Sequence, residues 1–253
     1  MPRTTFIVCL GLCATAACGA DESSGEVSRA APSASTEDSA STEDEVPASP
    51  TASRARPERR LQEPPADALG SMPDGVGVEV GVPAPDARLE DADGAAVHLA
   101  DLRARGPILL VFYRGGWCPF CNVQIHDLVE AYPEYQRRGV TPVAISVDRP
   151  EAAATTRATY EIPFPVLADP DLAAHEAYRV GRTVPAEELE RLRGFGMDLE
   201  EASGRDHHVI ALPALFFIDR GGVVRWAHAD PDYRTRPSNR QILEVIDALT
   251  ESR

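Results

Sequence analysis

The stretch that decides the fold runs from residue 108 to residue 121 and reads Ile108-Leu109-Leu110-Val111-Phe112-Tyr113-Arg114-Gly115-Gly116-Trp117-Cys118-Pro119-Phe120-Cys121. It begins with a continuous apolar run, which is typical of a strand buried on both faces of a parallel sheet. The two glycines predict a turn. Pro119 suits the first position of a helix, because its missing N–H would have no partner there. The stretch therefore predicts a buried strand, a turn, and a helix that starts at two cysteines.

The two cysteines are spaced for reversible chemistry. Cys118 falls at or near the N-cap, where the N–H groups of Phe120 and Cys121 can point at its sulfur. Those donors and the helix dipole favour the thiolate, so we expect Cys118 to be the acidic, exposed sulfur. Cys121 lies one turn on, and helical neighbours of this spacing sit about 5–6 Å apart, within reach of a disulfide. The spacing predicts a redox-active Cys118–Cys121 disulfide.

Residues 1–17 have the pattern of an export signal. Arg3 gives a positive start, an apolar core follows, and small residues precede Cys18. This resembles a bacterial lipoprotein signal, in which that cysteine is lipidated, although Thr15 stands where leucine is usual. An ordinary secretory signal cleaved nearby is the alternative. Both predict export to the cell envelope or periplasm, and the first adds a lipid anchor to a bacterial membrane at Cys18.

Residues 18–70 are rich in Ser, Thr, Pro and acidic residues, and the run Ser35-Thr36-Glu37-Asp38 recurs from Ser41 to Asp44. A segment with so few large apolar residues cannot offset the entropy lost on ordering. We therefore expect a disordered acidic tether. Residues 71–253 have the length of one domain with a sizeable core.

Within that domain, strand-like and helix-like segments alternate between glycine and proline punctuation, which predicts an α/β fold. The expected elements are a hairpin over 88–99, strands over 108–113, 143–147 and 164–167, helices over 119–138 and 150–160, a helical insertion over 185–201, a hairpin over 214–227 and a closing helix over 238–249.

Composition excludes several chemistries. The net charge is −15, and an acidic chain of this kind is a poor nucleic-acid binder. There is no lysine, which removes a P-loop lysine and any Schiff-base mechanism. No glycine-rich dinucleotide-binding motif follows the first strand. We expect no cofactor.

The positions of the cysteines also indicate whether the pair is chemical or structural. Of five cysteines, Cys9 and Cys13 fall in the signal and Cys18 is the lipidation candidate, so the domain keeps only Cys118 and Cys121. A disulfide that closes so short a loop stabilises a fold weakly. The pair is therefore predicted to be chemical rather than structural.

A Cys-x-x-Cys pair can also bind zinc or attach haem. Structural zinc needs four ligands, and the nearby candidates are His126 and the adjacent His207 and His208. Their spacing is unsuited to a Cys₂His₂ site, so we expect no metal. Haem attachment requires histidine directly after the second cysteine, and residue 122 is Asn.

The motif from Trp117 to Cys121 resembles the thioredoxin superfamily. The wider run 112–121 and the later run 212–219 are similar to its peroxiredoxin-like branch (alkyl hydroperoxide reductase/thiol-specific antioxidant type). The resemblance implies a thioredoxin-like fold: a central mixed sheet flanked by helices, with an N-terminal β-hairpin and a helical insertion. It assigns catalysis to Cys118 and Cys121, and active-site support to Trp117, Pro119, Arg114 and Pro213. Pro213 takes the place of the cis-proline that faces the dithiol in that superfamily.

The chain also departs from the peroxiredoxin pattern. An ungapped comparison places the peroxide-reacting cysteine at Cys121, puts Cys118 and Arg114 where threonine and proline are usual, and puts Pro213 where an arginine is usual. The buried aspartate of thioredoxins is replaced by Phe112. The dithiol is thus better supported than a peroxide site.

The resemblance implies an exported thiol-dependent oxidoreductase that reduces disulfides, or peroxides by a second route. In the first route Cys118 attacks and Cys121 resolves the mixed disulfide. In the second, one sulfur becomes a sulfenate and its partner condenses with it. Both need an external reductant, either a thioredoxin-like protein or a small thiol. The alternative is a non-catalytic thioredoxin-like module that holds a metal or docks a partner.

Overall fold

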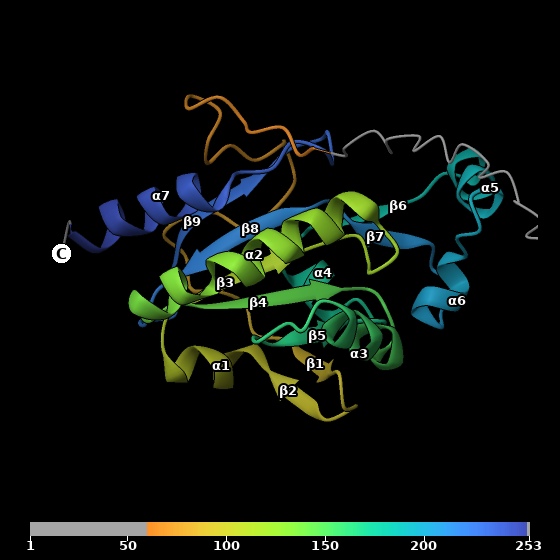
Figure 1. Ribbon diagram of the computed structural model, residues 1–253, viewed down its shortest axis with the longest axis horizontal. Coiled ribbons are helices and arrows are strands. Elements are labelled where there is room, and N and C mark those ends of the chain that lie inside the picture. The colour runs from red at the N-terminus through yellow and green to blue at the C-terminus, as the bar shows by residue number, and fades with distance from the viewer. Residues whose placement is uncertain (1–59, 252–253) are drawn as a thin grey trace, which may run out of the picture. The chain divides into compact units, whose positions relative to one another are not determined.

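The structure is a computed structural model that describes residues 60–251 (Figure 1). The predicted signal, Cys18 and the tether up to residue 59 lie outside the described residues. In chain order the elements are β1 (Arg88–Asp91), β2 (Ala96–His98), α1 (Leu99–Arg105), β3 (Ile108–Phe112), α2 (Pro119–Arg137), β4 (Thr141–Ser146), α3 (Pro150–Thr159), β5 (Val166–Ala168), α4 (Ala173–Ala177), β6 (Gly181–Thr183), α5 (Ala186–Gly194), α6 (Leu199–Ser203), β7 (Val209–Ala211), β8 (Ala214–Ile218), β9 (Val224–Ala229) and α7 (Asn239–Glu251).

One mixed sheet organises the domain, with the strand order β2-β1-β5-β4-β3-β8-β9. Strands β3, β4 and β5 run parallel to one another, and β1, β2, β8 and β9 add antiparallel pairs on either side. Strands β6 and β7 form a separate antiparallel pair. The predicted α/β class, with a mixed sheet, flanking helices and the N-terminal hairpin β1–β2, is confirmed.

The apolar run of β3 is buried along its whole length, and its side chains alternate between two cores. Leu109 and Val111 pack into a cluster that includes residues of α2, α3 and α7. Leu110 and Phe112 pack on the opposite face, in a cluster that includes Phe216. Figure 1 shows α2 crossing in front of the sheet. A strand with helices or strands on both faces has no polar side, which explains the unbroken apolar sequence.

Several short elements were not expected from the sequence. They are α1, α4 and the β6–β7 pair, each of seven residues or fewer, too short to show a clear period. The predicted helix over 185–201 is wrong as a single helix. It breaks into α5 and α6 around Gly194 and Gly196, and Asp198 caps α6 by accepting the N–H groups of Glu200 and Glu201.

The ordered domain begins earlier than the predicted boundary at residue 71. Gln62 N–H donates to Arg234 O at 2.9 Å, and Arg236 N–H donates back to Gln62 O at 2.8 Å. Gln241 Nε2 donates to Pro64 O at 3.0 Å. Residues 60–70 therefore belong to the domain rather than to the tether, because their backbone groups are bonded to it.

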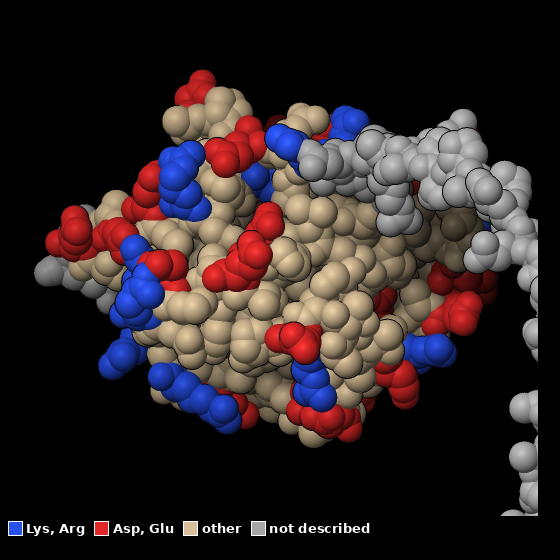
Figure 2. Space-filling model, viewed as in Figure 1, with Lys and Arg blue, Asp and Glu red and all other residues tan. Residues whose placement is uncertain are grey.

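Acidic and basic side chains are interspersed on the face shown in Figure 2, around a broad uncharged area. Within residues 60–251, no helix has both the length and the apolar character needed to cross a membrane.

The burial of β3 predicts a specific stability loss. Leu110 is fully buried, so Leu110→Ala is expected to lower the free energy of unfolding by about 2–5 kcal/mol, from lost transfer energy and a cavity. Chemical denaturation measures this. Val80→Ala is the control, because Val80 is 57% exposed and should change stability by less than about 0.5 kcal/mol. Equal losses in the two variants would contradict the arrangement.

Candidate active site

The turn between β3 and α2 is tied to the end of β4. Gly116 N–H donates to Asp148 Oδ2 at 2.8 Å. Gly115 has a φ of 148°, and a Cβ there would lie 2.7 Å from Asp148 Oδ1 and still nearer the indole nitrogen of Trp117. Residue 115 must therefore be glycine both for its conformation and for the space it leaves.

The two cysteines are free thiols and both are buried, Cys118 at 1% exposure and Cys121 at 0%. Cys118 is the N-cap of α2, and Pro119 is its first residue, as predicted. The side chain of Cys118, however, makes no capping hydrogen bond. The expectation of an exposed Cys118 sulfur is wrong, because the first turn of α2 packs into the core beside Val111 and the partly buried Trp117.

A buried arginine that the sequence did not single out lies beside the second sulfur. Arg236 is 3% exposed, and its Nη2 lies 3.6 Å from Cys121 Sγ. Its Nη1 donates to Gln124 Oε1 in α2, and its Nε donates to Tyr233 O at 2.9 Å. Arg236 comes from the segment between β9 and α7, 115 residues from Cys121, so no local spacing could have revealed it.

These neighbours make Cys121 the acidic sulfur. Burial opposes ionisation of Cys121, but the hydrogen bond from Cys118, the charge of Arg236 and the backbone N–H of Arg114 outweigh it and lower the pKa of Cys121 to about 5. The hydrogen bond to Cys121 and burial both raise the pKa of Cys118. The prediction that Cys118 is the acidic sulfur is therefore wrong, because the nearest cation and the thiol donor both face Cys121.

Aromatic rings and a second arginine cover the motif. The guanidinium of Arg114 lies 4.6 Å from the ring centre of Tyr233 and 5.2 Å from that of Trp117, close enough for cation–π attraction. Tyr233 also packs edge-on against Phe120, with ring centres 5.4 Å apart. Arg114 Nη2 donates to Glu188 Oε1 of α5 at 3.4 Å. The predicted support residues Arg114 and Trp117 thus lie together at the motif, joined by Tyr233, which was not predicted.

Polar groups are buried on the other side of the turn. Burial raises the pKa of Asp148 to about 6, against the hydrogen bond from Gly116. Burial and the charge of Asp148 also raise the pKa of Tyr113. A buried carboxylate, that of Asp148 just after β4, thus lies near the dithiol. In thioredoxins the buried aspartate comes from the position that Phe112 holds here.

Pro213 is buried directly before β8, whose first residue Ala214 pairs with Phe112 at the end of β3. It therefore lies at the sheet edge from which the motif emerges. Residues 60–251 contain no cis peptide bond, so the cis-proline implied by the resemblance is wrong. The chain enters β8 from the β6–β7 pair, and Leu212 N–H donates to Val180 O at 2.8 Å.

The three histidines that could have served as zinc ligands have other neighbours. A ring nitrogen of His207 lies 3.1 Å from Pro170 O, and one of His208 lies 2.7 Å from Glu200 Oε1. His126 lies with Asp127 and Glu130 on the exposed side of α2. Among the described residues, that trio is the one group of metal-ligating side chains with close donor atoms, and it includes neither cysteine.

Comparison with known proteins agrees with this geometry. Residues 80–227, more than half of the chain, match the model of the AhpC/TSA family. The chain belongs to the AhpC/TSA family. That assignment confirms the peroxiredoxin-like resemblance drawn from residues 112–121 and 212–219.

Some individual relatives are named peroxiredoxins and others thiol-disulfide oxidoreductases. A Mycobacterium tuberculosis protein named as a peroxiredoxin is 40% identical over 98 residues, which cover 38% of this chain and 62% of that protein. The thiol-disulfide oxidoreductase ResA of Geobacillus thermodenitrificans is 35% identical over 105 residues, or 41% of this chain and 59% of that protein. The chain thus spans less than two thirds of the length of these relatives.

Among solved structures, peroxidoxin BcpB from Mycobacterium tuberculosis superposes with a TM-score of 0.55 over 70% of this chain and 99% of that chain. Its sequence is 18% identical, so this likeness shows the shared fold alone.

The contact between Arg236 and Cys121 predicts the pH dependence of thiol reactivity. The alkylation rate of Cys121 should rise with pH around a midpoint of about 5. Arg236→Met removes the charge at similar volume, which favours the thiol and should move the midpoint toward the value of about 8.5 of a free cysteine. Arg236→Lys should give an intermediate midpoint. Peptide-resolved mass spectrometry separates Cys121 from Cys118.

Arg234→Met is the matched control, because Arg234 is two residues away, half exposed, and paired with Asp232 at 2.6 Å. Its midpoint should stay near that of the parent protein. An unchanged midpoint in Arg236→Met would show that the guanidinium does not stabilise the thiolate.

Proposed function

We propose that this chain is a thiol peroxidase that reduces small peroxides with Cys118 and Cys121 and is regenerated by an external thiol. The observation that carries the proposal is the buried Cys121 sulfur beside Arg236, with the pKa lowered to about 5. A thiolate is the nucleophile that attacks peroxide, and a fully buried one favours a small oxidant over a protein disulfide. Membership of the AhpC/TSA family supports the same chemistry.

In the first step the Cys121 thiolate attacks one peroxide oxygen and the O–O bond breaks, which leaves a sulfenic acid on Cys121 and releases hydroxide or an alkoxide. Cys118 holds the nearest proton, because its thiol is hydrogen-bonded to Cys121. It protonates the leaving oxygen to water or an alcohol and becomes a thiolate itself.

In the second step the Cys118 thiolate attacks the Cys121 sulfur, and the S–O bond breaks as the S–S bond forms. The hydroxide that leaves takes a proton from solvent. Over both steps one peroxide and two thiols become one disulfide, with water and an alcohol, or two waters, as products. Two external thiols then reduce the disulfide, since the folded domain has no further cysteine.

Reduction of protein disulfides is the second candidate. The Trp117–Cys121 motif and the likeness to proteins named ResA favour it. Such a substrate must reach a sulfur directly, whereas both sulfurs are at most 1% exposed. For that reason we place peroxide reduction first.

Turnover of the two substrates, side by side, tests the choice. With dithiothreitol as reductant, the purified protein should consume hydrogen peroxide catalytically and reduce insulin disulfides slowly. Cys121→Ser should abolish peroxide turnover. Cys118→Ser should allow one round of oxidation, leaving a sulfenic acid on Cys121 that a dimedone-type reagent traps.

Each opposite result has a defined meaning. Fast insulin reduction without peroxide turnover would replace the first function with the second. No turnover of either substrate, together with stoichiometric bound zinc or copper in native mass spectrometry, would favour the non-catalytic module. Peroxide turnover that survives in Cys121→Ser would overturn the assigned nucleophile.

We further propose that the protein acts outside the cytosol, held to a membrane by a lipid on Cys18. The support is the sequence of residues 1–18 alone. In bacterial cells the protein should fractionate with membranes, and Cys18→Ser should move it to the soluble fraction, because a lipid chain is the only predicted anchor. Cys13→Ser is the control. Membrane retention of Cys18→Ser would exclude lipidation at that residue.

A further inference from the structure

A cavity of about 560 Å³ lies beside the motif, between α3 and the α5–α6 insertion. Gly116 and Trp117 line one end of it, and residues 195–198 between α5 and α6 line another. A volume of this size accommodates a small organic ligand. The dithiol mechanism above makes no use of this cavity.

The apolar part of its wall is largely aromatic. Trp117, Tyr160 and Phe195 all line it. Phe195 is 78% exposed, an unusual setting for so large an apolar side chain, and lies between Gly194 and Gly196. Aromatic faces attract cations as well as apolar groups.

Its charges are predominantly negative. The cavity is lined by four carboxylate residues, Asp148, Glu151, Asp198 and Glu201, and by one guanidinium, that of Arg149. Arg149 lies 3.9 Å from Glu151 and leaves the balance negative. An anionic ligand would therefore be repelled at most positions along the wall, and a cationic one attracted.

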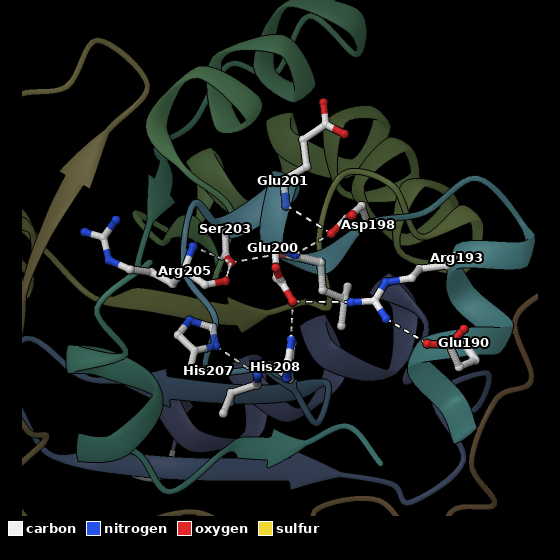
Figure 3. A network of polar contacts seen from close by, with 11 residues as sticks. Glu190, Arg193, Asp198, Glu200, Glu201, Ser203, Arg205, His207 and His208 are labelled. Atoms are coloured by element: carbon white, nitrogen blue, oxygen red, sulfur yellow. Dashed lines mark hydrogen bonds and ion pairs between the residues drawn. The ribbon is translucent and has the colours of Figure 1, made fainter. Parts of the chain in front are cut away.

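The carboxylates differ in how far their hydrogen-bonding capacity is already used. Asp148 is 1% exposed, its Oδ2 accepts the N–H of Gly116, and a hydrogen bond with the Trp117 side chain also lowers its pKa. Asp148 therefore contributes charge near the cavity rather than a free acceptor. Figure 3 shows the Glu201 carboxylate pointing away from the network in which Glu200 contacts Arg193 and His208.

We propose that this cavity binds organic cations with an aromatic or apolar body, and holds them against Trp117, the residue directly before Cys118. The amine would face Glu201, and the apolar body would lie against Trp117 and Phe195. Where the proposed redox function holds, the same site selects cationic thiols over anionic ones as the external reductant; this clause rests on that function.

Binding is tested first without redox chemistry. Calorimetric titration of the reduced protein compares 2-phenylethylamine with phenylacetate, which have a similar ring and opposite charge. The amine should bind at least about tenfold more tightly, and the difference should shrink as salt is added. Equal affinities, or tighter binding of the acid, would overturn the proposal.

Paired variants locate the site. Glu201→Gln should weaken amine binding about threefold to tenfold and leave phenylacetate no weaker, as expected for loss of one partly solvated charge. Phe195→Ala should weaken both ligands alike. Glu187→Gln is the matched control, since Glu187 is an exposed carboxylate of α5 that does not line the cavity. An equal effect of Glu187→Gln and Glu201→Gln would place the preference in the overall charge of the protein and overturn the site.

The selectivity for cationic thiols is tested on peroxide-oxidised protein. Cysteamine and 2-mercaptoethanesulfonate are compared as reductants of the disulfide, and each rate is divided by the rate for Glu201→Gln, which cancels intrinsic thiol reactivity. The ratio should exceed one for cysteamine and not for the sulfonate. Equal ratios overturn the selectivity. Failure of peroxide to form the disulfide would instead overturn the proposed function and leave amine binding standing.

Discussion

A buried guanidinium beside a buried sulfur is the contact around which this domain is arranged. Arg236 Nη2 lies 3.6 Å from Cys121 Sγ, and both side chains are almost fully excluded from solvent. An unpaired charge buried there would be strongly destabilising, so the guanidinium and the Cys121 thiolate stabilise each other. Gln124 of α2 and Gln62 before the first strand hold Arg236 through its side chain and its backbone. Three distant parts of the chain thus meet at one arginine, which contacts the sulfur.

The dithiol lies between a cation and a carboxylate, and this asymmetry distinguishes its two sulfurs. Arg236 favours negative charge on Cys121, while Asp148 lies on the other side of the glycine turn with its own pKa raised to about 6. Negative charge on Cys121 also opposes ionisation of Asp148. Cys118, which donates a hydrogen bond to its partner, keeps its proton. Position on the helix alone would have favoured the opposite assignment.

Residues 185–204 have two connections with the motif. Glu188 of α5 accepts from Arg114 and is paired with Arg182 at 2.9 Å. The loop around Phe195 forms one wall of the acidic cavity next to Trp117. The insertion therefore contacts both the arginine that covers the motif and the cavity next to Trp117.

Much of the fold could be predicted from local pattern. The apolar run of β3, the hairpin β1–β2, the start of α2 at Pro119 and the hairpin β8–β9 depend on residues close together in the chain, and the structure has them as expected. Short elements such as α4 could not be predicted, because a helix of five residues shows too little periodicity. Gly194 and Gly196 are visible in the sequence as potential helix breakers. The helix-favouring residues on either side nevertheless led to the prediction of a single helix.

The sequence by itself determined the fold class and the presence of two thiols at a helix start, since these depend on hydrophobic period, turn residues and the spacing within one motif. Its runs 112–121 and 212–219 also carried the resemblance to the family. Only the tertiary structure decided which sulfur is acidic, how deeply both are buried, and what surrounds them. Those properties arise from Arg236, Tyr233 and Asp148, which reach the motif from elsewhere in the fold. Electrostatic stabilisation depends on distance in space and on burial, and neither is encoded in separation along the chain.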